Sequence, residues 1–384
     1  MQNKVLFCAT VDYHFKSFHL PILKWFKEQG WEVHVAAFGD MELPFVDRKF
    51  HIPIQRSPFK LKNMEAYQEL KKIIGEQQYR MIHCHTPMGG VLTRLAAQSA
   101  RKNGTKVIYT AHGFHFCMGS PIMNWLVYYP IEKMLSRNTD CLITINQEDY
   151  ELAVNHHFKA DRIEHVHGVG VDIDRFKPID ENNKHERRKK LGYNKNDFLL
   201  FYAAEFNKNK NQQFLIKAIA KMKEQVPHAK LLLAGEGQLL EECKKLALEL
   251  GAEKMVHFLG YRNNIDEILP LCDAAVASSL REGLPVNIME AMACGLPVVA
   301  TKNRGHNELI QHHCSGWTVD NESIQEMVER LVLLAREPNL LTTFGQKGRE
   351  IIESKYSVNN VINQKSFIYL EYMKEMEDFS WAAQ

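Results

Sequence analysis

The chain has 384 residues, of which 45% are hydrophobic and 24% charged, and 48 Lys and Arg against 46 Asp and Glu give a net charge of +2. The length exceeds that of a typical single core, so we expect two domains. The even charge balance gives no case for a nucleic-acid-binding protein.

The cysteines and apolar runs indicate where the protein works. The eight cysteines never form a CxxC pair, which is typical of buried thiols in a reducing cytosol and argues against disulfides or a zinc site. No apolar run approaches the roughly 18 residues of a membrane span, and the N-terminus lacks a signal-peptide core. We expect a cytoplasmic protein, with peripheral contact to the inner face of the cell membrane as an alternative. Paired basic residues such as Lys60 and Lys62 are either solvated or weakly attracted to an anionic membrane.

Short apolar runs alternate with amphipathic stretches in the first part of the chain. Helical patterns cover, for example, residues 64–75 and 91–102, and the predicted strands are residues 5–10, 32–38, 81–85, 107–111, 141–145 and 163–166. Strands that alternate with helices predict a parallel sheet with helices on both faces. We assign residues 1–172 to this α/β domain.

A polar, charge-dense segment interrupts the alternation. Residues 173–192 lack an apolar period and predict a linker that leads into a short helix. Residues 193–356 then form a second predicted α/β domain, with strands at 198–204, 230–234, 255–259, 274–278, 297–301 and 317–319. Aromatic residues at helical spacing in 357–384 predict one or two helices, which we expect to pack on the N-terminal domain. The predicted fold is α/β, with two Rossmann-like, doubly wound parallel sheets whose ligands bind beyond the carboxyl ends of the strands.

Residues 278–308 (SSLREGLPVNIMEAMACGLPVVATKNRGHNE) predict a strand, a loop, a helix, a turn and a strand. Pro285 suits the first helical position, because it has no N–H to leave unpaired and its φ is preset. Gly295 suits the left-handed position just after the helix. The helix N-terminus would offer free N–H groups and a positive dipole end to a phosphate or diphosphate.

Two carboxylates accompany this helix. Glu290 lies within IMEAMA, where almost every neighbour is apolar or small. A carboxylate buried there needs a partner, which the hydroxyls of a ribose could supply; the alternative is that Glu290 caps a neighbouring loop. Glu282 lies in the loop before the helix, so we expect one carboxylate to serve a ribose and the other a sugar.

Glu282, seven intervening residues and Glu290, followed by AMA and GLPVVAT, resemble the EX7E signature of retaining glycosyltransferase family 4. LLLAGEG (231–237) and VHFLGY (256–261) match the same family upstream. YTAHGFHF (109–116) and DCLITINQEDYELA (140–153) resemble its bacterial exopolysaccharide and capsule-assembly members. The resemblance covers essentially the whole chain and implies the GT-B fold, in which two Rossmann-like domains face each other across a cleft.

The resemblance implies a donor site in the second domain. Glu290 would bind the donor ribose and Glu282 the transferred sugar. Tyr261 and Arg262 would lie near the base, and Gly235 would also contact the donor.

The resemblance also implies groups that meet the leaving diphosphate. Its backbone contacts fall on a loop in which Pro285 replaces the usual second glycine and has no N–H to donate, so the candidate positions are Gly283, Leu284, Pro285, Val286 and Asn287. A cationic pair, usually Arg then Lys, stabilises the charge in the family. Lys210 matches the Lys, whereas Glu205 stands at the Arg position, and Lys208 is the candidate substitute.

In the first domain the resemblance places a histidine, His112, near the donor sugar; the alternative is a structural histidine. The family's glycine-rich N-terminal loop is replaced here, and we expect the acceptor pocket to be shaped by Asp12, Tyr13, His14 and Phe15. His83, His85, His112 and His115 could suggest a metal, but no carboxylate or cysteine set accompanies them. We therefore expect no metal and no cofactor, with the nucleotide sugar as a co-substrate.

The predicted reaction moves a hexose or N-acetylhexosamine from a UDP-sugar, with retention, to a lipid-linked saccharide in exopolysaccharide or capsule biosynthesis. Catalysis would rest on positioning and on stabilisation of the leaving diphosphate, which the resemblance makes the base for the acceptor. Residues 123–135 are either a packed helix or a membrane contact. Two other functions stay open. One is a UDP-sugar epimerase of the same fold. The other is a non-catalytic subunit of a polysaccharide assembly complex, an alternative that depends on Glu205 at the position of the family's arginine.

Overall fold

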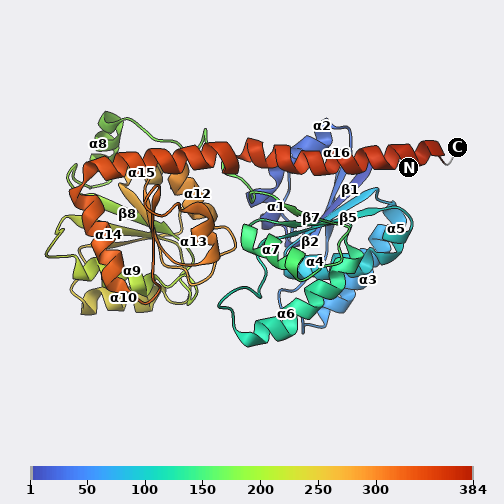
Figure 1. Ribbon diagram of the computed structural model, residues 1–384, viewed down its shortest axis with the longest axis horizontal. Coiled ribbons are helices and arrows are strands. Elements are labelled where there is room, and N and C mark those ends of the chain that lie inside the picture. Colours follow the sequence, from blue (N-terminus) through green and yellow to red (C-terminus); the bar gives the residue numbers. More distant parts are fainter. Residues whose placement is uncertain (1–2, 383–384) are drawn as a thin grey trace. The chain divides into compact units, whose positions relative to one another are not determined.

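The computed structural model describes residues 3–382, and the chain divides into two units. Unit 1 comprises residues 1–170 with 359–384, and unit 2 comprises residues 171–358. Residues 1–2 and 383–384 of the predicted first domain and C-terminal segment lie outside the described residues. Each unit is a parallel sheet between helices (Figure 1), which confirms the predicted fold class.

Unit 1 contains a seven-stranded parallel sheet in the order β3-β2-β1-β4-β5-β6-β7. Its strands are β1 (Lys4–Val11), β2 (Glu32–Phe38), β3 (Arg48–His51), β4 (Met81–His85), β5 (Lys106–Ala111), β6 (Cys141–Thr144) and β7 (Arg162–His165). Its helices are α1 (Tyr13–Phe18), α2 (Leu20–Glu28), α3 (Lys62–Gln77), α4 (Pro87–Ala96), α5 (Gln98–Lys102), α6 (Ile122–Leu135), α7 (Gln147–Asn155) and α16 (Val358–Ala382), with a 3-10 turn at Ser136–Asn138.

Unit 2 contains a six-stranded parallel sheet in the order β10-β9-β8-β11-β12-β13. Its strands are β8 (Phe198–Ala203), β9 (Ala229–Ala234), β10 (Val256–Gly260), β11 (Ala274–Ala277), β12 (Val298–Thr301) and β13 (Gly316–Val319). Its helices are α8 (Glu181–Lys190), α9 (Gln212–Lys221), α10 (Leu240–Glu249), α11 (Ile265–Ile268), α12 (Val286–Ala293), α13 (Arg304–Leu309), α14 (Ile324–Arg336) and α15 (Pro338–Ile351), with a 3-10 turn at Leu269–Leu271 and a π-helical turn at Ile352–Tyr356.

Every predicted strand is present, and its ends agree with the prediction to within one residue. The sequence missed β3, a four-residue strand with the sequence RKFH at the edge of the first sheet. Edge strands commonly carry charged side chains, which remove the apolar alternation that identifies a strand. The helix after β11 begins at Val286, so Pro285 is its N-cap and does not occupy the predicted first helical position. Gly295 has φ of +74°, the left-handed conformation expected just after this helix.

Side-chain alternation along β1 builds the two cores of unit 1. Val5, Phe7 and Ala9 face the core under α1, α2 and α16, whereas Leu6 and Cys8 face the core under α3 and α4. Figure 1 shows α16 on one side of this sheet and α3, α4 and α6 on the other.

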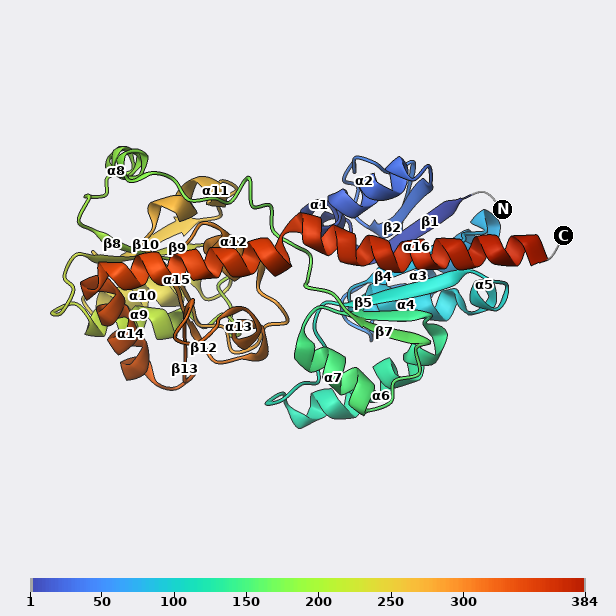
Figure 2. The ribbon, with the colours of Figure 1, turned by 45° about the horizontal axis from the view of Figure 1, so that its top comes forward.

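The C-terminal helix α16 is fixed to unit 1 by an apolar stripe and by polar contacts. Val361, Ile368, Tyr369 and Tyr372 are buried in the core that it covers, and Figure 2 shows the helix along the sheet. The Tyr369 hydroxyl and His83 Nδ1 are 2.7 Å apart. Through this contact, helix α16 reaches the side chain of His83 on strand β4.

A buried ion pair joins α4 to α6. Arg94 Nη2 lies 2.8 Å from Glu132 Oε2, and the guanidinium stacks on the Tyr109 ring at 3.9 Å. The Tyr109 hydroxyl donates to Glu132 Oε1 at 3.3 Å. Because both charges are shielded from water, each depends on the other for stabilisation.

We predict that Arg94→Met destabilises unit 1 by about 3–5 kcal/mol, because it leaves the Glu132 carboxylate buried without its counter-charge. The thermal unfolding midpoint of this unit should fall by roughly 10 °C. Lys244→Met, which breaks the exposed Lys244–Glu241 pair at 2.7 Å, is the matched control and should cost less than about 1 kcal/mol. Equal losses in the two variants would show that the buried pair does not hold α6.

Candidate active site

Each sheet reverses its strand order at one point, and the predicted site residues follow the strands beside these points. In unit 2 the order reverses between β8 and β11, and in unit 1 between β1 and β4. Loops that leave adjacent parallel strands in opposite directions open a crevice at their carboxyl ends, where ligands bind in such folds. The loops after β8 and β11 carry Lys210 and Glu282, and the loop after β1 leads to His14.

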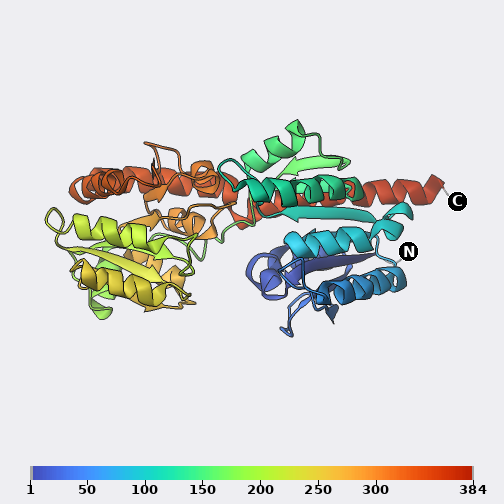
Figure 3. The ribbon, with the colours of Figure 1, turned by 90° about the horizontal axis from the view of Figure 1, so that it is seen from below.

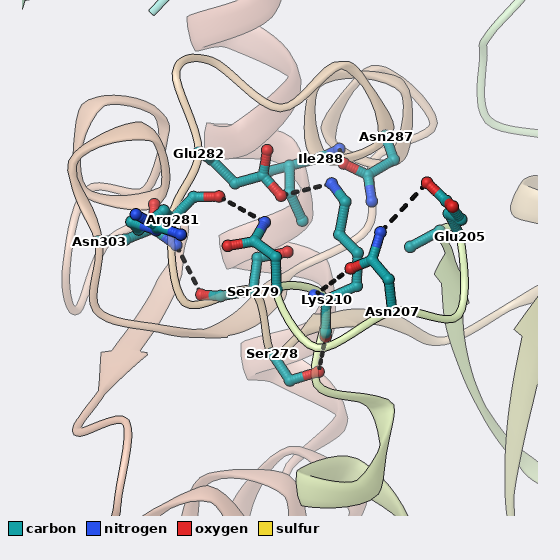
Figure 4. A network of polar contacts seen from close by, with 12 residues as sticks. Glu205, Asn207, Lys210, Ser278, Ser279, Arg281, Glu282, Asn287, Ile288 and Asn303 are labelled. Carbon is teal, nitrogen blue, oxygen red and sulfur yellow. Dashed lines mark hydrogen bonds and ion pairs between the residues drawn. The ribbon is translucent and has the colours of Figure 1, made fainter. Parts of the chain in front are cut away.

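An ion pair connects the two loops at the reversal point of unit 2. Lys210 Nζ lies 2.5 Å from Glu282 Oε1, and both side chains are largely buried. Ser278 Oγ donates to the Lys210 carbonyl at 2.7 Å, and Asn209 Nδ2 donates to the Arg281 carbonyl at 2.9 Å (Figure 4). The structure thus brings the two predicted catalytic residues of this unit into direct contact.

The N-terminus of α12 lies directly behind Glu282 in the chain. Pro285, its N-cap, has extended backbone angles and provides no side-chain cap. Within the described residues, the backbone N–H groups of Leu284, Val286 and Asn287 have no hydrogen-bond partner. The Asn287 side chain instead donates to the carbonyl of Ala203 at the end of β8, at 2.9 Å. The arrangement leaves donors and the positive end of the helix dipole for an anion.

Glu290 lies one turn further along α12. Burial raises the pKa of its carboxyl to about 7, although the Arg175 guanidinium lowers it in part. That guanidinium is itself paired with Asp266, at 2.9 Å. Among the described residues nothing donates a hydrogen bond to the Glu290 carboxylate, so the structure contains no loop cap of the kind considered as an alternative.

The remaining predicted donor-site positions are spread over two further loops. Gly235 follows β9, has φ of +139°, and a Cβ there would lie 2.1 Å from the Ala204 carbonyl oxygen, so only glycine allows this approach. Tyr261 and Arg262 follow β10 and are exposed to solvent. Their proposed contacts with a donor stay predictions.

Glu205 is the acidic residue at the position where the family resemblance implies an arginine. Glu205 is exposed, and its Oε2 accepts a hydrogen bond from Asn207 Nδ2 at 3.1 Å. Asn207 Oδ1 in turn accepts from the Lys210 N–H at 3.0 Å. Lys208 is exposed and forms no ion pair with the described residues. Glu205 therefore helps to shape the loop that presents Lys210.

Unit 1 contains a pocket of about 840 Å³ at its own reversal point. Tyr13 and His14, two of the four residues predicted to shape the acceptor pocket, line it, together with His112, which was predicted to lie near the donor sugar. The other two predicted residues lie elsewhere. Phe15 is fully buried in the core below α1, and the Asp12 carboxylate accepts hydrogen bonds from Lys49 Nζ at 2.6 Å and the Met41 N–H at 2.8 Å.

Four histidines meet beside this pocket: His14, His19, His85 and His112, with one ring nitrogen of each within 4.8 Å of the others. Nε2 of His14 lies 3.1 Å from Nε2 of His19, and Nδ1 of His85 lies 3.3 Å from Nε2 of His112. Sequence reasoning missed His19, which carries no motif of its own. His83 bonds to Thr110 and Tyr369, and His115 stacks on Tyr128 at 4.7 Å, so neither joins the cluster.

These histidines are neutral at pH 7. Burial lowers the pKa of His14 to about 4 and holds the pKa values of His19, His85 and His112 well below 6.5. The buried ammonium of Lys365 on α16 lowers the pKa of His14 and His112 further, and its own pKa is lowered by burial to about 8. The spacing would admit a cation, but the cluster contains no carboxylate and a lysine adjoins it, which opposes a divalent ion. The expectation of no metal stays a prediction.

Comparison with known proteins shows which family the chain belongs to. Residues 183–351 match the family described as Glycosyl transferases group 1, and residues 4–146 match Glycosyl transferase 4-like. The chain is 49% identical over 373 residues to EpsD of Bacillus subtilis (strain 168), whose name assigns it to the glycosyltransferases, with 97% of this chain and 98% of EpsD covered. The chain belongs to this glycosyltransferase family.

Two further relatives are more distant. The glycosyltransferase is 26% identical, over 84% of each chain, to the Escherichia coli UDP-Gal:alpha-D-GlcNAc-diphosphoundecaprenol alpha-1,3-galactosyltransferase. The crystal structure of Anabaena Alr3699/HepE in complex with UDP superposes with a TM-score of 0.78 at 21% identity, covering 96% of this chain and all of HepE. That structure shares the fold. None of the helices in the described part of the glycosyltransferase has the length and apolar content needed to cross a bilayer.

We predict that Glu290→Gln stabilises the ligand-free glycosyltransferase at pH 8. The folded-state pKa of about 7 lies above the ordinary value of 4.5, so stability falls as the pH rises from 4.5 to 7, and the full penalty remains above pH 7. The thermal unfolding midpoint of the variant should lie roughly 5 °C above that of wild type at pH 8, and this difference should be much smaller near pH 5. Glu253→Gln, which removes an exposed carboxylate of the same unit, is the control. A gain that does not depend on pH would contradict the prediction.

Proposed function

We propose that the protein transfers a hexose or N-acetylhexosamine from a UDP-sugar, with retention of the anomeric configuration, to a lipid-linked saccharide acceptor. The observation that carries the proposal is Glu290, a partly buried carboxylate to which none of the described residues donates a hydrogen bond, on a helix whose first N–H groups have no partner among those residues. A nucleoside diphosphate supplies both missing partners, since its ribose hydroxyls donate to a carboxylate and its phosphates accept from N–H groups.

The same loops could stabilise the leaving group. As UDP departs, negative charge develops on the diphosphate, and a fixed ammonium and backbone donors stabilise that charge without reorganisation. Lys210 is held by Glu282 and by two backbone contacts, so its position is defined before a donor binds. Glu282 would then contact the sugar that is transferred, and the leaving phosphate would accept the proton of the acceptor hydroxyl.

The acceptor is proposed from different observations. The galactosyltransferase of Escherichia coli named above has UDP-Gal and a diphosphoundecaprenol-linked saccharide in its name. The pocket of unit 1 is lined by neutral histidines and by apolar side chains of α4 and α6, which suits a saccharide beside a lipid. The proposed setting is exopolysaccharide or capsule biosynthesis at the inner face of the cell membrane, with no metal and no cofactor beyond the nucleotide sugar.

The deciding experiment measures UDP release from a panel of UDP-sugars, with and without a lipid-linked acceptor extract. We expect release from one donor that depends on the acceptor, and a product with the anomeric configuration of the donor by NMR. Interconversion of UDP-sugars without acceptor would instead identify an epimerase. No turnover in a protein that binds UDP would indicate a non-catalytic subunit, and Glu205 would be the residue to replace next.

Glu290→Ala should lower kcat/KM for the donor roughly 10- to 100-fold, which is the range for a lost hydrogen bond to a charged group. The loss should be mainly in KM, because the ribose is bound alike before and during the reaction. Glu253→Ala is the matched control. An unchanged KM would remove Glu290 from the donor site.

Lys210→Met should lower kcat by about 10²–10³-fold, the cost of removing one donor to a developing negative charge. Lys217→Met replaces an exposed lysine of the following helix and should leave kcat unchanged. If both variants behave alike, Lys210 serves only to hold the loop.

A further inference from the structure

Unit 1 exposes large apolar side chains in two segments, residues 56–64 and 118–126. Phe59 is 89% exposed and Met118 is 87% exposed, and five other side chains in these segments are at least 60% exposed: Leu61, Met64, Ile122, Met123 and Leu126. Single exposed apolar residues are common on soluble proteins, but seven in two short segments are not. We call these two segments the docking surface.

The first segment lines the pocket of unit 1, and the second leads along α6 into residues that line it. Phe59 and Leu61 line it from the loop before α3, and Met64 lines it from the first turn of α3. Residues 118–126 do not themselves line it, but they lead into Val127 and Ile131 of α6, which do. The helix α4, which also lines the pocket, packs against both α3 and α6. Figure 3 views unit 1 from the side that carries these helices. The docking surface therefore lies beside the pocket in which we place the acceptor, with its first segment forming part of the pocket lining.

The charges of the docking surface have one sign. Residues 56–64 (RSPFKLKNM) contain Arg56, Lys60 and Lys62, all exposed, and no acidic residue. Residues 118–131 contain no charged residue, and Glu132, which follows, is buried against Arg94. Exposed lysines between apolar side chains suit the boundary of an anionic bilayer, where apolar groups enter the acyl region and ammonium groups meet phosphate.

We propose that the docking surface inserts into the surface of a bilayer containing anionic phospholipid. The proposal deepens the proposed function, on which its reference to a lipid-linked acceptor rests, because it would place the pocket mouth at the bilayer surface where such an acceptor emerges. A second copy of the chain is a poorer occupant, since a self-complementary contact would bring like charges together. Each basic side chain near an anionic surface strengthens binding roughly fivefold, so three of them with seven apolar groups suffice for reversible attachment.

Vesicle flotation tests the proposal, with phosphatidylcholine vesicles that contain or lack phosphatidylglycerol. Wild type should float with the anionic vesicles and much less with the neutral ones. Ile122→Ser/Leu126→Ser and Lys62→Glu, at positions that do not line the pocket, should each weaken binding roughly tenfold. The matched controls are Leu248→Ser/Leu250→Ser and Lys217→Glu, at exposed positions of unit 2, and they should bind like wild type.

A tryptophan probe reports insertion as a difference from wild type, which has five tryptophans of its own. Emission of Phe59→Trp minus that of wild type should shift to shorter wavelength when anionic vesicles are added, whereas the difference for Leu248→Trp should not. Equal binding by all variants, or no binding of wild type to anionic vesicles, would overturn the proposal. Self-association that the Ile122→Ser/Leu126→Ser variant abolishes, without vesicle binding, would instead identify a second copy as the occupant and would also overturn it.

Turnover on a short-chain, water-soluble acceptor analogue separates this proposal from the proposed function. If Ile122→Ser/Leu126→Ser loses vesicle binding and keeps this turnover, both proposals are supported. Turnover by a wild type that never binds vesicles would refute the docking surface alone. Vesicle binding without turnover on any acceptor would refute the proposed function alone.

Discussion

The ion pair between Lys210 and Glu282 joins the two loops that leave the middle of the second sheet. These loops follow adjacent strands and diverge, so nothing in the sheet itself holds their ends together. The pair, with the hydrogen bonds from Ser278 and Asn209, fixes them at the point where α12 begins. A diphosphate at this helix end would compete with Glu282 for the ammonium of Lys210. The carboxylate would then be released toward the sugar at the moment when the donor is bound.

Two features of α12 conflict with local stability. Its first turn has no side-chain cap, and Glu290 has a raised pKa because burial opposes its charge. A capping residue or an apolar side chain would be more stable at either place in the absence of ligand. Such conflicts concentrate at functional sites, where a ligand supplies the missing partner. The two conflicts lie one turn apart. The helix end needs a hydrogen-bond acceptor, and Glu290 behind it needs a hydrogen-bond donor. A single ligand that carries both groups could satisfy both.

The fold was predictable because parallel strands buried on both faces are apolar runs bounded by polar turns, and every such run became a strand. The edge strand β3 escaped because it is half exposed and charged. Site contacts were harder to predict. Lys210 and Glu282 are 72 positions apart in the chain, and periodicity cannot pair side chains across such a distance. Phe15 illustrates the same limit, since a residue beside a predicted pocket loop turned inward to the core. For Glu290, whose apolar neighbours are adjacent in sequence, the sequence alone predicted an environment that opposes the charge of the carboxylate, and burial does raise its pKa.

The family resemblance implies an arginine at the position of Glu205, and the structure shows which cations lie near the site in its absence. The Glu205 carboxylate accepts a hydrogen bond from Asn207 on its own loop and makes no ion pair with Lys210. A second cation lies at this loop, because Arg304, at the start of α13, donates a hydrogen bond from Nε to the Glu282 carbonyl at 3.0 Å. The loop before α12 is therefore bordered by two cations, Lys210 and Arg304, even without an arginine at position 205.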